Sequence, residues 1–79
     1  MKEKIEIYST AYLLEDLAGT PFVKGDVGVV AEVYEHADMY EIEFFSIDGS
    51  TLSVEPVPGA MLRSCKGIRQ VPHVIGLAA

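Results

Sequence analysis

The sequence predicts a small all-β domain. Short runs of β-branched and aromatic residues are separated by turn residues at close spacing. No apolar stripe with the period of a helix continues for about ten residues or more. The chain has 79 residues, and a core of that size contributes only about 3–5 kcal/mol net, so we expect a compact fold or one completed by a partner. A catalytic cleft is not expected.

The first predicted strand covers residues 7–14, which are rich in β-favouring side chains. Residues 15–24 should form a loop, because Pro21 disfavours helix at the residue before it. The alternative is an open antiparallel sheet with a helix over residues 11–17. Gly19 and Pro21 would leave that helix short, so it ranks second.

Residues 27–34 form the second predicted strand. Gly28 lies inside this run, and a glycine there indicates a bulge, a sharp bend or the close approach of another backbone. Such a glycine suits a strand that curls into a barrel. A short turn over residues 35–38 follows. Simple alternation puts four small apolar side chains of the strand on one face: Val27, Val29, Ala31 and Val33.

The third predicted strand, residues 39–47, alternates cleanly between apolar and acidic positions. Tyr40, Ile42 and Phe44 should face the core. Alternation then places three side chains on the outer face: Glu41, Glu43 and Phe45.

The dipeptide Asp48-Gly49 predicts a tight hairpin after this strand. A fourth strand over residues 51–54 should pair back on the third, with Leu52 and Val54 pointing inward and the hydroxyls of Thr51 and Ser53 pointing to water. We expect the following prolines to stop the sheet. These are Pro56 and Pro58.

A single 3₁₀ turn is predicted over residues 58–62 and a last short strand over residues 63–65. Five short strands, a long first loop, a tight third-to-fourth hairpin and a 3₁₀ turn before the last strand occur in this order in SH3-like barrels. The sequence therefore predicts a five-stranded SH3-like barrel over residues 1–65. Residues 66–79 should form a non-barrel C-terminal extension that is first basic and then apolar.

Charge is segregated along the chain. Residues 25–62 contain eight acidic residues and no Lys or Arg, whereas three cations are the only charges that follow, within a net charge of −6. Binding to a nucleic acid backbone needs clustered Lys and Arg, so nucleic acid is not an expected partner. Because the acids are spread through periodic apolar sequence, they should lie on the wet face of a sheet.

The inventory for catalysis and metal binding is small. One Cys and two His, His36 and His73, cannot complete a structural zinc site, and the acids follow no calcium-loop spacing. Cys65 is expected to be a small buried apolar side chain without a disulfide, which favours a cytoplasmic location. No signal peptide or membrane span is expected. We predict no catalytic residue, metal or cofactor.

Residues 24–34 resemble the opening of SH3-like and KOW-type barrels, with Gly25, Gly28, Val30 and Val33 in the motif positions. Together with residues 13–17, 40–44, 48–49 and 61–63, they make residues 7–65 similar to a family of small bacterial proteins, domain-of-unknown-function family number 4926. This resemblance implies an SH3-like barrel, and some members are found as the presumed neutralising partner beside a toxin gene. It implies no catalytic residues, and it does not extend to residues 66–79.

The predicted function is non-catalytic protein binding with a basic protein as partner. We expect this partner to be the product of an adjacent gene, which the chain neutralises as an antitoxin or immunity-like protein. The alternative is an accessory barrel of a larger enzyme, of the nitrile hydratase β-subunit type. KOW-like nucleic-acid binding ranks last because Lys24 is the one basic residue near the relevant loop. The predicted binding residues are Glu32, Tyr34, Glu41, Glu43 and Phe45.

Phe45 carries two competing expectations. An aromatic side chain ringed by carboxylates could anchor a basic partner. Alternatively, Val74, Ile75 and Leu77 of the C-terminal extension could fold back over it. The extension could also join two copies of the chain into a homo-oligomer.

Overall fold

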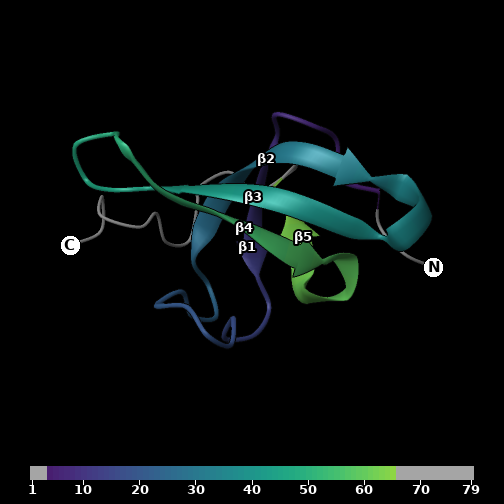
Figure 1. The fold of residues 1–79 in the computed structure, drawn as a ribbon, viewed down its shortest axis with the longest axis horizontal. Helices are drawn as coiled ribbons and strands as arrows, with labels where there is room; N and C mark the ends of the chain where they lie inside the picture. Colours follow the sequence, from purple (N-terminus) through teal and green to yellow (C-terminus); the bar gives the residue numbers. More distant parts are fainter. Residues whose placement is uncertain (1–3, 66–79) are drawn as a thin grey trace.

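The computed structural model describes residues 4–65. Within them, five strands form one antiparallel sheet in the order β4-β3-β2-β1-β5 (Figure 1). The described residues contain two 3₁₀ turns and no α-helix, so the all-β prediction is confirmed and the helix of the alternative fold is wrong. The elements are β1 (Thr10–Leu13), β2 (Val27–Tyr34), η1 (Glu35–Ala37), β3 (Met39–Phe45), β4 (Thr51–Pro58), η2 (Gly59–Met61) and β5 (Leu62–Ser64).

Most predicted boundaries lie close to the observed ones. β2 has the predicted bounds, β3 ends two residues early, and β5 begins one residue early. The 3₁₀ turn before the last strand is confirmed. β1 is shorter than predicted because the chain turns at Tyr8, whose φ is 69°. The predicted extension over residues 66–79 lies outside the described residues.

The prolines near the end of β4 do not stop the sheet. Pro56 pairs with Glu41, and Pro58 pairs with Met39. The prediction was wrong because β4 is the edge strand of the sheet. An edge strand has one side without a neighbouring strand, and a proline nitrogen that faces this side removes no hydrogen bond from the ladder. β4 therefore runs four residues beyond its predicted end.

A bulge in β2 changes which side chains face the core. The register with β3 shifts between Val30 and Glu32, so the predicted common face of residues 27, 29, 31 and 33 is wrong. Val30 lies opposite Ile42 and Val33 opposite Tyr40, and these pairs face the core. Glu32 is thereby turned to the outer face. One extra residue in a strand inverts all later side chains.

The inward orientation predicted for Leu52 and Val54 is also wrong. Both are exposed, at 53% and 45%. Val54 lies directly opposite Glu43, and opposed residues share a face of the sheet. Ser53 lies opposite Phe44 and is half-buried on the core side. The hairpin register, rather than the apolar pattern of the short strand, decides these orientations.

The core lies on the inner face of the sheet. Phe44 is fully buried, and its ring stacks on Phe22 from the β1–β2 loop with centroids 4.0 Å apart. The three predicted core positions of β3 are confirmed. A β-carbon at Gly28 would lie 2.8 Å from the main-chain oxygen of Glu43 and closer still to Ile42, so the close approach predicted at this glycine is confirmed. The core residues are Ile5, Ala11, Leu13, Leu17, Phe22, Val30, Tyr40, Ile42, Phe44, Val57 and Leu62.

The hairpin between β3 and β4 projects at the left of Figure 1 and is organised by Asp48. The Gly49 amide donates to the main-chain carbonyl oxygen of Ser46 at 2.9 Å, and Gly49 has φ 88°. The carboxylate of Asp48 accepts from the hydroxyls of Ser46 and Ser50 and from the Ser50 amide. These hydrogen bonds, that of Ser46 first, lower the pKa of Asp48 to about 2.

Asp48 should make the hairpin sensitive to acid. A carboxylate whose pKa is depressed in the folded state stabilises the fold above its unfolded pKa of 3.8, and this contribution disappears as the pH falls through about 2. We expect Asp48→Asn to remove this part of the acid dependence. The measurement is the melting temperature of both proteins between neutral and strongly acidic pH. Parallel profiles with a constant difference would contradict this expectation.

Tyr8 occupies a backbone conformation that favours glycine. The main-chain amide of Tyr8 donates to the carbonyl oxygen of Val30, whereas the side chain of Tyr8 is 76% exposed. A left-handed conformation costs a non-glycine residue about 1–2 kcal/mol, and glycine costs about 0.5–1 kcal/mol of entropy. Tyr8→Gly should therefore raise the free energy of unfolding by up to about 1 kcal/mol in urea denaturation. Tyr8→Ala is the matched control, because alanine keeps the steric penalty; equal stability of the two variants would show that φ is not strained.

Candidate functional site

The outer face of β2 and β3 brings the predicted binding residues together. Glu32 lies opposite Glu41 across the two strands, and Tyr34 lies opposite Met39. Along β3, the outer positions alternate with buried Tyr40, Ile42 and Phe44. We call the surface formed by these outer side chains the acidic face. It consists of Glu32, Tyr34, Glu41, Glu43 and Phe45.

Tyr34 and Glu41 are joined across the acidic face. The phenol of Tyr34 donates to the Glu41 carboxylate at 2.8 Å. This hydrogen bond raises the pKa of Tyr34, and desolvation and the negative charges of Glu41 and Glu32 add to the increase. Because Glu32 and Glu41 are directly opposed like charges, they repel each other. A cation brought between them would relieve this repulsion.

Within residues 4–65, no basic side chain forms a salt bridge with the acidic face. The ion pair recorded there is Lys4–Glu35 at 3.9 Å, between two exposed side chains. On the β4 side, Glu43 accepts a hydrogen bond from the Thr51 hydroxyl. Glu41 and Glu43 therefore accept hydrogen bonds from neutral donors, and no salt bridge with a described residue offsets their attraction for a cationic partner.

Exposed apolar side chains border the acidic face along β4 and its hairpin. They are Ile47, Leu52 and Val54. The sequence interpretation missed this border because it assigned Leu52 and Val54 to the core. The loop between the strands covers residues 47–49, since the Ser46 amide donates to the main-chain oxygen of Ser50, and the register shift at Leu52 then places Val54 opposite Glu43.

Phe45 lies on the acidic face and is half-buried. It pairs with Thr51 at the register shift between β3 and β4. Its predicted orientation is thus confirmed. Residues 74–77, which the sequence indicated as one possible cover for its ring, lie outside the described residues.

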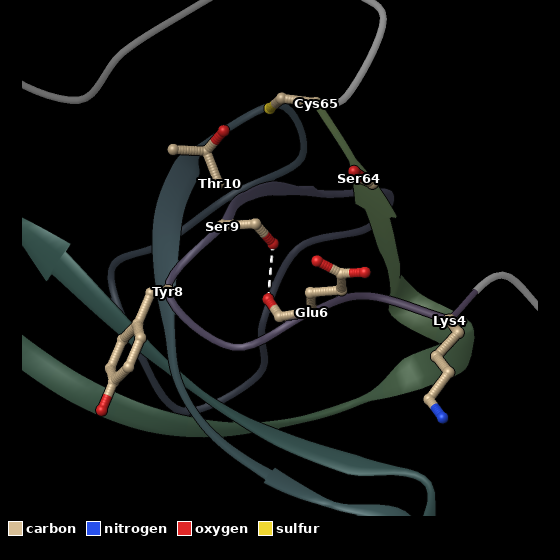
Figure 2. A pocket seen from close by; sticks show the side chains of 7 residues that line it. All are labelled: Lys4, Glu6, Tyr8, Ser9, Thr10, Ser64 and Cys65. Atoms are coloured by element: carbon tan, nitrogen blue, oxygen red, sulfur yellow. Dashed lines mark hydrogen bonds between the residues drawn. The ribbon is translucent and has the colours of Figure 1, made fainter.

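A concavity that the sequence did not predict lies beside the N-terminal segment and β5 (Figure 2). It has a volume of about 440 Å³. Cys65 is buried and has a free thiol, as predicted. In the part of the chain that the structure describes, no three His, Cys, Asp or Glu residues are grouped as metal ligands. The lining residues are Lys4, Glu6, Tyr8, Ser9, Thr10, Ser64 and Cys65.

The described residues form a small all-β domain built on one antiparallel sheet, and this sheet carries the acidic face. The model of the family described as Domain of unknown function (DUF4926) matches residues 7–64. The chain therefore belongs to this family. Searches of curated proteins and of solved structures found no match. Among the described residues, no helix is long and apolar enough to cross a membrane.

Proposed function

We propose that the chain is a non-catalytic protein-binding domain whose sheet closes as an SH3-like barrel and whose acidic face binds a basic protein. The main support is that Glu32, Glu41 and Glu43 lie on one face, where no described basic side chain forms a salt bridge with them. Hydrogen bonds from Tyr34 and Thr51 orient the carboxylates of Glu41 and Glu43, so these two side chains lose less freedom on binding.

The partner we propose is the product of an adjacent gene, which the chain neutralises as an antitoxin or immunity-like protein. Segregated negative charge accelerates encounter with a basic protein and selects against acidic ones. The apolar border of Ile47, Leu52 and Val54 would then supply the desolvated part of the interface, which charges alone form poorly.

Co-expression of the tagged chain with each neighbouring gene product, followed by affinity purification, tests this function. A basic neighbour should co-purify at low salt and dissociate as the salt concentration rises. Failure of every neighbour to co-purify would contradict the proposal. Co-purification of a metalloenzyme whose activity depends on the chain would instead favour the accessory-subunit alternative.

A further inference from the structure

The hydrogen bonds of β2 reveal which main-chain groups of β4 point away from the sheet. Val30 uses both its amide and its carbonyl toward the β1 side, with Ser9 and Tyr8. Its opposite residue on β3 is Ile42, so this is a pair without mutual hydrogen bonds. The main-chain groups of Ile42 therefore face β4, where they meet Glu55.

Successive residues of a strand alternate in the direction of their main-chain groups. Because Glu55 faces β3, its neighbours Val54 and Pro56 face the free edge. Pro58 follows with the same orientation. This agrees with the chemistry of proline, which has no amide hydrogen to give to β3.

Val54 is therefore the first residue before the prolines that offers both an amide and a carbonyl at the free edge. Within residues 4–65, no strand pairs with this edge. Pro56 and Pro58 offer carbonyls only and limit strand addition at that end of β4. At the other end, Leu52 lies at the register shift, and its side chain is exposed beside that of Val54.

We propose that residues 51–55 of β4 bind an extended segment of the basic partner, which adds to the sheet as a sixth strand. This proposal rests on the proposed function for the basic character of the partner. Val54 would exchange two main-chain hydrogen bonds with the added strand. An apolar side chain opposite Val54 would cover it on the outer face, and the next residue, a lysine or arginine, would lie beside Glu55 on the other face.

Charge selects this occupant over a second copy of the chain. Edge-to-edge pairing of two copies would bring together two segments, each with eight acidic residues and no Lys or Arg over residues 25–62. Like charges across such an interface are unfavourable, whereas an alternating basic and apolar segment matches both Glu55 and the exposed side chains of Leu52 and Val54.

The first test uses fluorescent peptides that alternate lysine and valine, with binding to the full chain measured by anisotropy. One peptide carries N-methyl groups on its valines and a matched peptide carries the same number on its lysines. In the proposed register the valine amides face β4, so valine methylation should weaken binding at least about tenfold relative to lysine methylation. Equal affinities of the two methylated peptides, or no binding of the unmodified peptide, would overturn the proposal.

The second test changes the protein. Val54→Pro removes the edge amide without removing a bond to β3, as at Pro56, whereas Val54→Thr keeps both the amide and the branched shape. We expect Val54→Pro to weaken peptide binding about tenfold and Val54→Thr to stay within about threefold of wild type. If Val54→Pro instead converts a dimer to a monomer in sedimentation, a second copy is the occupant and the proposal is wrong.

The experiments distinguish failure of the strand-addition proposal from failure of the proposed function. If Val54→Pro and valine methylation have no effect while charge reversal on the acidic face abolishes binding of the partner, binding uses the face and not the edge. If charge reversal has no effect on the partner, the proposed function itself fails.

Discussion

Phe44→Ala is expected to unfold most of the protein at room temperature. Phe44 has no exposed surface, and its ring stacks on Phe22, which fastens the β1–β2 loop to the sheet. Removing a buried phenylalanine side chain costs about 3–5 kcal/mol, including the cavity that remains. Because a core of this size contributes about 3–5 kcal/mol in total, little net stability would be left. Circular dichroism and urea denaturation measure the effect.

Phe45→Ala is the matched control, since it removes the same side chain one position further along β3, on the opposite face, where the ring is half-buried. It should leave a cooperative unfolding transition. An equally cooperative and equally stable Phe44→Ala protein would show that the core described here does not hold the fold. If Phe45→Ala changes neither stability nor partner binding, Phe45 is neither an anchor nor a covered residue.

Charge reversal on the acidic face should have the largest effect on binding. In the double variant Glu41→Lys, Glu43→Lys, two attractive charges at the centre of the face become repulsive toward a basic partner. We expect the affinity to fall at least about a hundredfold at low salt, because like-charge contacts across an interface cost several kcal/mol. The fold should survive, since replacing Glu41 also removes its repulsion with Glu32.

The control for this variant changes the net charge equally at a different place. Glu6→Lys, Glu15→Lys replaces two exposed carboxylates outside the acidic face. If long-range attraction alone drives binding, both double variants should weaken it equally. A much larger effect of the Glu41, Glu43 variant, measured by calorimetric titration with the co-purified partner, would show that the acidic face is the contact surface.

The parts of the fold that follow a regular period could be predicted from the sequence. Tyr40, Ile42 and Phe44 alternate without interruption, and the structure buries all three. The hairpin at Asp48-Gly49 is also present, because a local turn signal needs no information from the rest of the chain.

The irregular parts could not be predicted in the same way. The β2 bulge depends on how Val30 and Glu32 meet β3, and a pattern within one strand does not contain that register. The long β4 depends on its place at the sheet edge, which Pro56 and Pro58 do not encode locally.

The sequence predicted which residues share the acidic face, but not which residues surround that face. The five residues of the acidic face lie together as expected, although Glu32 and Tyr34 follow a bulge between Val30 and Glu32, a position that the sequence did not indicate. The apolar border was missed because Leu52 and Val54 look like core residues when burial is inferred from hydrophobicity alone. Edge strands break that inference, since they can keep apolar side chains at the surface for a partner.

Amide chemical shifts measured while the co-purified partner is titrated into isotope-labelled protein give the most direct test of the acidic face. The account predicts the largest changes at Glu32, Tyr34, Glu41, Glu43 and Phe45, with smaller changes at the concavity beside β5. Shift changes centred on that concavity, with the acidic face unaffected, would contradict it.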